Sequence, residues 1–354
     1  MTRIIDRGLY SAHMQTGGIA RSPARRLLYA TTLVGVMLAM TGCTSALTHA
    51  GATPSATQPG ASSPGPSVVP TPSAGGAPLA GLDVPADAVV ASDRSGNVVA
   101  IAPDGSVTRT LIPDVVTGGP PGHVRLSADG STVYFDRGRP GCWLEFAYDS
   151  GDGGPSAPEG DGSWPSPNAN GSLVAAVTGA DSCHPDTLEI LSLTATPRTW
   201  RLSAALRSQG FQLTGPLAWS ADGKLLSVPM VSGRQHRVLI LTVDTPGTQL
   251  TGSGITPLHA GGSVDAAFFV TGGLITLESC CGTTPTYQLE QRTLSGTTAG
   301  KASAALTIAQ PVDIDISTAG RIAIVTAAGH IAVGVFPHLA PVNGTYVAVA
   351  IAAP

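Results

Sequence analysis

The sequence predicts an all-β protein built from repeated small sheets, and three observations support this prediction. Gly and Pro are frequent, with 44 and 29 copies in 354 residues, whereas only 12% of the residues are charged, which is unlike the composition of long helices. Turn-forming residue pairs separate short apolar, β-branched segments. These turns recur at intervals of 41, 52, 50 and 47 residues. A sheet of four short strands has this period, so the pattern predicts a β-propeller.

Composition and charge exclude two other classes of protein. The formal net charge of −4 supplies no basic field of the kind that binds phosphates, so we expect no nucleic-acid partner. No run of 18 or more apolar residues occurs, which excludes a protein that crosses the membrane several times.

Residues 1–42 have the charge order of a secretory signal peptide. Five arginines and one aspartate occupy residues 1–26, and a mostly apolar, uncharged stretch follows at 27–41. About 15 residues are too few to span a ~30 Å hydrocarbon core comfortably, so we expect this stretch to be cleaved off. The pair Arg25-Arg26 leaves the twin-arginine export route open beside the general one, and Met14 is an alternative start.

The segment Ala39-Met40-Thr41-Gly42-Cys43 resembles the lipobox of bacterial lipoproteins, in which small residues precede an obligatory cysteine. The resemblance implies cleavage before Cys43 and a covalent diacylglycerol on its thiol; no other cofactor is expected. Several acyl chains together anchor a protein stably. We therefore expect a lipid-anchored protein on the extracytoplasmic side of the cell membrane. An ordinary secreted protein is the alternative.

Residues 43–86 are expected to form a disordered tether between the lipidated cysteine and the folded part. From 44 to 82 the sequence contains no Asp, Glu, Lys, Arg, Phe, Trp or Tyr and consists mostly of Ala, Gly, Pro, Ser and Thr. Such a segment cannot bury enough apolar surface to offset its ordering entropy. Cleavage before Cys43 would leave 14 basic and 22 acidic residues, a net charge near −8.

Residues 87–354 carry the repeat. Its turns are Asp129-Gly130, Asn170-Gly171, Asp222-Gly223, Gly272-Gly273 and Ala319-Gly320. Glycine at these positions accepts the positive φ that a two-residue hairpin needs. In the repeat that reads most clearly, strands are expected over 216–220, 224–231 and 237–243, and a fourth from 248.

The two ends of this region predict how the ring closes. Residues 88–112 supply three strands before the first complete repeat, and a spare apolar strand remains at 346–352. Together they complete one more sheet, which would remove the open edges that invite aggregation. We predict six four-stranded blades; seven would need a much shorter period.

Three phrases superimpose closely: LSADGSTVYF (126–135), WSADGKLLSV (219–228) and ISTAGRIAIV (316–325). On these residues the chain resembles TolB-type and WD-repeat-like propellers. It is similar to propeller lipoproteins of high-GC Gram-positive bacteria, in keeping with 17 Arg against 2 Lys. TolB-like propellers serve as docking platforms in envelope complexes. The resemblance therefore implies a platform that binds an envelope protein or peptide on one flat face.

Besides Cys43 the chain has four cysteines, Cys142, Cys183, Cys280 and Cys281. An even number in an exported chain indicates disulfides. All four are expected in or beside the connections between the second and third strands of their blades, on one face. A Cys142–Cys183 bond with a vicinal Cys280–Cys281 bond is one solution, and pairing across blades is the other. We expect no metal site, because Cys183-His184 has no second ligand pair at metal-binding spacing.

Alternation along the innermost strands places five polar side chains on the side of the central channel: His123, Arg125, Asp265, Asp313 and Asp315. We expect them to surround the mouth of the channel as a polar funnel for a small cation, a sugar or a peptide end. The alternative is that they are polar only because water fills the channel.

No enzyme motif is present in the sequence. The SADG turns lack the spacing of a sialidase Asp-box, no G-x-S-x-G elbow occurs, and GTTAGK at 296–301 is one residue short of a phosphate loop. We therefore expect a binding protein without catalytic residues. A channel-centred enzyme of lactonase or sialidase type, or a small-solute binding protein, is the alternative.

Overall fold

A computed structural model describes most of the region expected to fold. The described residues are 82, 84, 88–102, 104, 106–113, 121–139, 142–149, 157–179, 183–192, 195–243, 249–250, 253–257, 261–281 and 284–352, with the backbone alone at 137–139, 142–149, 157–161 and 253. The predicted signal peptide, Cys43 and nearly all of the predicted tether lie outside these residues.

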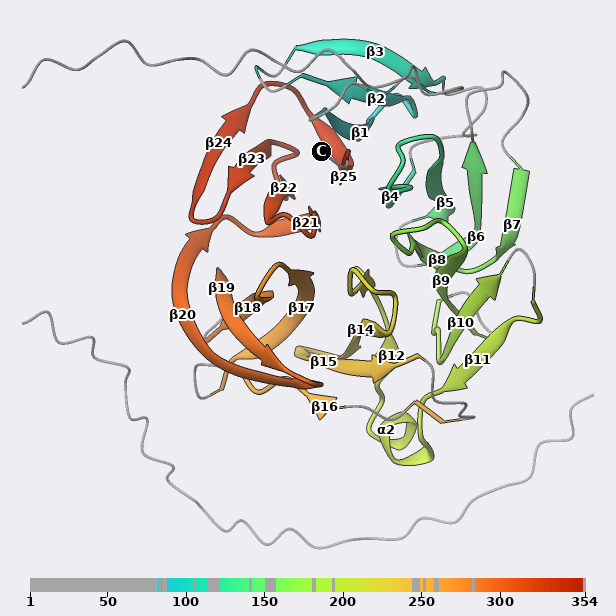
Figure 1. Ribbon diagram of the computed structural model, residues 1–354, viewed down its shortest axis with the longest axis vertical. Coiled ribbons are helices and arrows are strands. Elements are labelled where there is room, and N and C mark those ends of the chain that lie inside the picture. Colours follow the sequence, from blue (N-terminus) through green and yellow to red (C-terminus); the bar gives the residue numbers. More distant parts are fainter. Residues whose placement is uncertain are drawn as a thin grey trace, which may run out of the picture. The chain divides into compact units, whose positions relative to one another are not determined.

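The described strands form antiparallel sheets arranged around a centre, as a β-propeller (Figure 1). Five sheets have four strands each. One runs β25-β1-β2-β3 (Tyr346–Ile351, Val89–Asp93, Val98–Ile101 and Val107–Ile112). The next runs β4 to β7 (Val124–Leu126, Val133–Arg139, Cys142–Asp149 and Ala157–Asp161).

Three further four-stranded sheets follow the same plan. One holds β8 to β11 (Ser163–Pro167, Leu173–Thr178, Thr187–Ser192 and Arg198–Arg201). Another holds β17 to β20 (Ser263–Val270, Gly273–Cys280, Thr286–Ser295 and Thr298–Ile308). The last holds β21 to β24 (Pro311–Ile316, Arg321–Thr326, Ile331–Val335 and His338–Val342). The expected all-β propeller is thus confirmed.

The sheet between β11 and β17 departs from the predicted four strands. It contains β12 (Gln212–Leu213), β13 (Ala218–Trp219), β14 (Leu225–Ser232), β15 (Gln235–Thr242) and β16 (Ser253–Gly254), and both β12 and β13 pair with β14. We predicted one inner strand over 216–220. Pro216 has no N–H to donate to the ladder, so the inner edge is split into two short pairings. Five sheets are thus four-stranded blades, and the prediction of six such blades is wrong in number because this sheet does not follow the four-stranded plan.

The predicted turns are present between the first and second strands of the sheets. The glycines at 130, 171, 223, 272 and 320 all have φ between 68° and 85°. In the turn before β14, the Asp222 carboxylate accepts hydrogen bonds from Ser220 Oγ (2.7 Å) and from the backbone N–H of Lys224 (3.1 Å). These hydrogen bonds of the aspartate side chain stabilise the turn and explain why the SADG sequence recurs.

The two ends of the repeat region share one sheet, as predicted. β25 pairs antiparallel with β1, with Val89 opposite Ile351 and Ala91 opposite Val349. β25 takes the inner position of this sheet, which closes the ring (Figure 1).

The core consists of the apolar faces between neighbouring sheets. For example, Phe268 and Leu289 pack with Ile314 and Ile322 of the following sheet. Leu82 and Val84, which lie within the predicted tether, are buried against the sheets of β1 and β4. Packing therefore begins before the predicted boundary at residue 87.

Helices contribute little to this structure. Within the described residues α2 (Ala204–Ser208) is a single short helix, capped by Ser203, whose hydroxyl accepts the N–H of Leu206. No helix of the described chain has the length and apolar character needed to cross a membrane.

Candidate functional site

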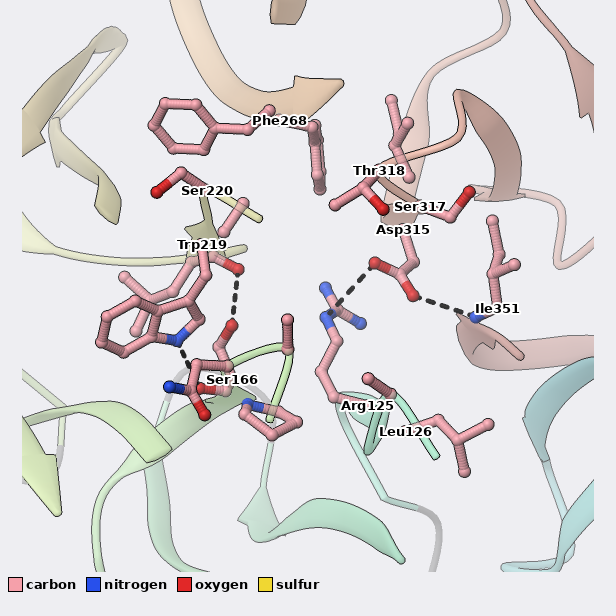
Figure 2. A pocket seen from close by; sticks show the side chains of 18 of the residues that line it. Arg125, Leu126, Ser166, Trp219, Ser220, Phe268, Asp315, Ser317, Thr318 and Ile351 are labelled. Carbon is pink, nitrogen blue, oxygen red and sulfur yellow. Dashed lines mark hydrogen bonds and ion pairs between the residues drawn. The ribbon is translucent and has the colours of Figure 1, made fainter. Parts of the chain in front are cut away.

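A cavity of about 160 Å³ opens at the centre of the ring, at the ends of the inner strands where they turn outward (Figure 2). Side chains from β4, β8, β13, β17 and β21 line it together with the turns that follow these strands. The lining is mixed: Arg125, Ser127, Ala128, Ser166, Asn168, Trp219, Ser220, Phe268, Asp315, Ser317 and Thr318 contribute to it.

Arg125, from β4, lies at the floor of this cavity with its side chain almost fully buried. Its guanidinium donates to the carbonyls of Val124 (2.6 Å), Ile314 (3.1 Å) and Val349 (3.0 Å). It also donates to both oxygens of Asp313 at 3.2 and 3.3 Å. One side chain thus links the inner strands of three sheets, β4, β21 and β25.

Two carboxylates of β21 accompany Arg125. Asp313 is 2% exposed and accepts the backbone N–H groups of Ile314 and Val349, both at 2.9 Å. Asp315 accepts the N–H of Ile351 at 2.9 Å, while its other oxygen lies 4.0 Å from Arg125 Nε. The side chain of Asp315 is 19% exposed and faces the cavity (Figure 2).

The pKa values of this group reflect burial and charge together. Burial would lower the pKa of Arg125, but the carboxylates of Asp313 and Asp315 outweigh it and raise that pKa above its ordinary value. Burial raises the pKa of Asp315, and the nearby Arg125 partly opposes this effect. The guanidinium is therefore charged at all physiological pH values.

The wall opposite Asp315 is held by hydrogen bonds between β8 and β13. The indole Nε1 of Trp219 donates to the carbonyl of Ser166 at 2.8 Å, and Ser166 Oγ donates to the carbonyl of Leu217 at 3.1 Å. These bonds fix the aromatic ring at the side of the cavity (Figure 2).

His123, predicted at the same mouth, lies elsewhere. It precedes β4, and its Nδ1 is 2.5 Å from Asp136 Oδ2 on β5. Its ring stacks on Trp164, with ring centroids 3.2 Å apart. Asp136 is fully buried and also accepts the N–H groups of His123 (2.9 Å) and Trp164 (3.1 Å). The histidine thus belongs to a packed cluster between β5 and β8.

Asp265 is also separate from the cavity. It lies near the start of β17, where the pairing with β18 shifts register between Val264 and Ala266. Its Oδ1 accepts from Ser279 Oγ (3.1 Å) and lies 3.3 Å from His236 Nδ1, whereas its buried Oδ2 has no hydrogen-bond partner in the described structure. Burial raises the pKa of Asp265 to about 7.

The prediction of one polar funnel therefore needs correction. The structure brings Arg125, Asp313 and Asp315 together and leaves His123 and Asp265 out. Strand alternation assigns a side of the sheet but not a height along the channel. His123 and Asp265 lie at the beginnings of their strands, and the cavity lies at the ends.

The sequence offered a weak signal for some of the residues it missed. Trp219 and Ser220 belong to the recurring turn phrase, so their blade position was visible, but their place in a cavity was not. Phe268 and Ser166 had no distinguishing pattern. The buried ion cluster of Arg292 with Glu278 and Glu290 was also missed. The sequence of one strand does not show which side chains of the neighbouring strand lie beside it.

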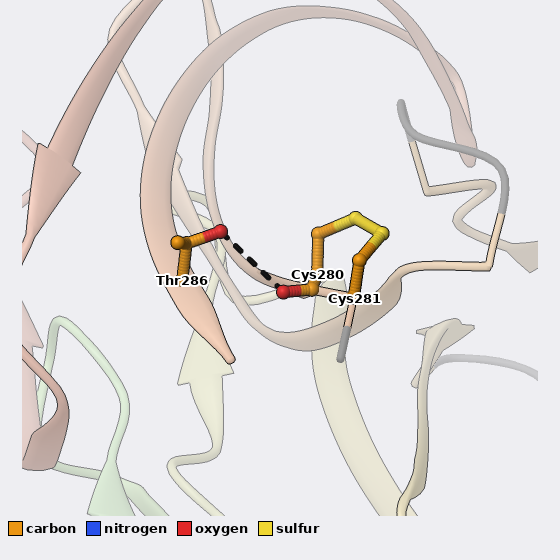
Figure 3. The surroundings of a disulfide bond; sticks show 3 residues. All are labelled: Cys280, Cys281 and Thr286. Carbon is orange, nitrogen blue, oxygen red and sulfur yellow. Dashed lines mark hydrogen bonds between the residues drawn. A yellow bond between two sulfur atoms is a disulfide. The ribbon is translucent and has the colours of Figure 1, made fainter. Parts of the chain in front are cut away.

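The vicinal cysteines form a disulfide. Cys280 ends β18 and bonds to Cys281, and the carbonyl of Cys280 accepts from Thr286 Oγ1 of β19 at 3.4 Å (Figure 3). Cys183 is disulfide-bonded as well and lies between β9 and β10. The side chain of Cys142 is outside the described residues, so the Cys142–Cys183 pairing stays a prediction. Within the described chain no group of three or more His, Cys, Asp or Glu residues is arranged to hold a metal ion.

Comparison with known proteins supports the fold. No protein-family model and no curated protein sequence matches the chain. The crystal structure of TolB from Acinetobacter baumannii superimposes with a TM-score of 0.55 at 11% identity, covering 75% of this chain and 66% of that chain, just under two thirds. At this identity the similarity shows the fold alone, a TolB-like propeller.

Two other solved structures have lower scores. A putative TolB from Agrobacterium tumefaciens has a TM-score of 0.46 at 14% identity, covering 72% of this chain and 87% of that one. A putative 6-phosphogluconolactonase from Bacteroides uniformis has a TM-score of 0.45 at 12% identity, covering 75% and 98%.

Proposed function

We propose that the protein is a lipid-anchored, extracytoplasmic propeller that binds a segment of an envelope protein or peptide in its central cavity. The observation that carries the proposal is the cavity itself, because it combines aromatic walls with polar groups at the centre of the ring. The lipobox-like segment before Cys43, the uncharged stretch 44–82 and the TolB-like fold support the cellular setting.

The proposed binding face differs from the one we first expected. The cysteine-bearing connections lie at the starts of the inner strands, whereas the cavity lies at their ends. Among the described residues the large apolar side chains that are strongly exposed are Val107, Val312 and Val335, on β3, β21 and β23. Three such side chains are too few for an extended apolar docking patch, so the cavity is the better candidate.

The cavity geometry favours binding over catalysis in this proposal. The guanidinium of Arg125 is occupied by structural hydrogen bonds, and the hydroxyls of Ser127 and Ser220 bracket their own turns. These groups are held in place by the fold. A channel-centred enzyme or solute-binding protein is the competing proposal.

Blocking the cavity tests the binding role. Ala128 is exposed in a Ser-Ala-Asp-Gly turn and lines the cavity, so Ala128→Trp should fill the entrance without entering the core. Loss of a central buried contact costs about 2 kcal/mol or more, so we expect the variant to bind its partner about thirtyfold more weakly. The measurement is capture from detergent-solubilised membranes of the source cells on the immobilised full-length chain, followed by titration of the captured protein.

Ala221→Trp is the matched control, because Ala221 occupies the same position in a second Ser-Ala-Asp-Gly turn but does not line the cavity. We expect it to bind like the wild type. Equal binding by both tryptophan variants would refute a role for the cavity. Turnover of a lactone or sialoside that is lost only in Ala128→Trp would favour the enzyme alternative.

Localisation has its own test. Cys43→Ala removes the thiol that accepts the diacylglycerol, so we expect the variant to leave the membrane fraction, since stable anchoring depends on the acyl chains. The readouts are membrane fractionation and the intact mass of the mature chain. A variant that still sediments with membranes, together with a wild type that carries no acyl mass, would contradict the anchor.

A further inference from the structure

The floor of the central cavity holds two carboxyl groups and one guanidinium. Arg125 faces two carboxylates, Asp313 and Asp315, and all three side chains are largely buried. We propose that the cavity takes an ammonium group of the bound peptide, with Asp315 as its counter-ion. This inference rests on the proposed function and names the chemistry of the group that is bound.

Arg125 is not the group that recruits a ligand. Its terminal nitrogens already donate to three backbone carbonyls and to Asp313. A guanidinium has five N–H donors, so little capacity remains for an incoming anion. An anionic ligand would also face the surplus carboxylate at short range, which is unfavourable in a buried site.

Asp315 is the carboxylate with capacity to spare. Asp313 is almost fully buried and uses both oxygens for Arg125 and two backbone N–H groups. Asp315 Oδ1 is 4.0 Å from Arg125 Nε, which is too long for a hydrogen bond. Its side chain is partly exposed and faces the cavity (Figure 2).

Three of the hydroxyls around the cavity complement a ligand that only donates. Ser127 Oγ donates to Asp129, Ser220 Oγ to Asp222 and Ser166 Oγ to the carbonyl of Leu217. With their protons committed, these serines can offer only oxygen lone pairs, and Ser127 and Ser220 each already use one to accept the backbone N–H of Thr132 or Leu225. An ammonium group has three donors and no acceptor, so it matches this environment.

Size and aromatic content agree with this assignment. Cavities of roughly 150 Å³ hold a benzene-sized group, so about 160 Å³ fits one side-chain end or chain terminus. Phe268 and Trp219 also line the cavity, and aromatic faces attract cations. The net charge near −8 expected after cleavage would draw a positively charged partner.

Small probes test the class of ligand on the full-length chain. N-acetyl-lysine methylamide carries only a side-chain ammonium, and glycyl-glycinamide carries only a terminal one. N-acetyl-norleucine methylamide and N-acetyl-glutamate methylamide are the neutral and anionic counterparts. Binding is followed by the indole ¹⁵N–¹H resonance of Trp219, one of four tryptophans, assigned with Trp219→Phe.

We expect saturable shifts with at least one ammonium probe, and affinity at least about tenfold weaker for the neutral probe. Asp315→Asn should weaken ammonium binding by about tenfold or more, because the amide can still accept the N–H of Ile351 but carries no charge. Asp104→Asn removes the same charge from the exposed turn between β2 and β3, away from the cavity lining, and should leave the affinity unchanged. The same spectra report whether each variant is folded.

Three results would overturn the assignment: no saturable shift with either ammonium probe, binding of the glutamate probe as tight as that of lysine, or equal affinities in Asp315→Asn and Asp104→Asn. Failure of the proposed function looks different. In that case Ala128→Trp would capture the membrane partner like Ala221→Trp, whatever the small probes do.

Discussion

Arg125→Met should lower the free energy of unfolding by about 3–5 kcal/mol at neutral pH, because removal of one partner from a buried ion pair leaves charges unpaired. Methionine fills a similar volume, so loss of packing is small. The variant would leave Asp313 and Asp315 facing each other without a cation. It would also cut the hydrogen bonds from β4 to β21 and β25.

Urea unfolding followed by fluorescence gives this difference from the midpoint and the slope. Arg201→Met is a control, because Arg201 is exposed on the outer strand β11 and its loss should change stability by about 0.5 kcal/mol or less. The loss in Arg125→Met should shrink in acid, since protonation of the two aspartates removes their repulsion.

A double-mutant cycle separates the pair from other effects. Asp313→Asn combined with Arg125→Met should be less destabilising than the sum of the single changes by about 0.5–3 kcal/mol, because the second change removes a charge that the first left unpaired. If the two changes are additive, or if Arg125→Met behaves like Arg201→Met, Arg125 does not tie the inner strands together.

The fold was predictable because its turns are specified by neighbouring residues and its closure follows from the number of strands at the two ends. A turn such as Asp222-Gly223 is specified by a few neighbouring residues, and in each predicted turn one glycine has the positive φ that the turn requires. Closure by β25 followed from the three strands before the first complete repeat and the one spare strand after the last. The split inner edge at β12 and β13 was missed, although Pro216 was visible and forbids a ladder hydrogen bond there.

The site was only partly predictable because its contacts join distant parts of the chain. Arg125 reaches Asp313 across 188 residues and Val349 across 224. Alternation placed the aspartates on the channel side, but which of them meet depends on how the sheets are set around the ring. The register shift at Asp265 is a one-residue irregularity that no residue type marks, and it moved this carboxylate into a different environment.

That environment makes Asp265 the source of an unusual pH dependence. Burial raises its pKa to about 7, whereas an unfolded chain has a value near 3.9. Between these values the folded state binds the extra proton, so this group makes stability fall as pH rises from about 4 to about 7. Above pH 7 the penalty is constant.

Asp265→Asn removes this titration. We expect the stability of the variant relative to the wild type to rise by roughly 2–4 kcal/mol between pH 4.5 and pH 8. In the variant, the amide buried at the position of the unpaired Oδ2 lowers the free energy of unfolding by an amount that does not change with pH. The test is therefore how the stability difference between the two chains changes with pH, and not its size at any one pH. His236 lies 3.3 Å from Asp265 and its pKa is lowered by burial, so His236→Gln is made in both chains to remove its own titration from the comparison.

Asp222→Asn supplies a control of opposite sign. Hydrogen bonds from Ser220 and Lys224 lower the pKa of Asp222, so its contribution to stability is present above the unfolded pKa and is lost as pH falls. The Asp222→Asn variant should therefore lose stability relative to the wild type as pH rises through the acid range.

The ¹³C resonance of the Asp265 carboxyl, followed against pH, gives an independent value for the titration midpoint of this group. A midpoint near 4, with a flat stability difference for Asp265→Asn, would mean that water or a neighbouring donor reaches Oδ2 and that the carboxylate is charged throughout.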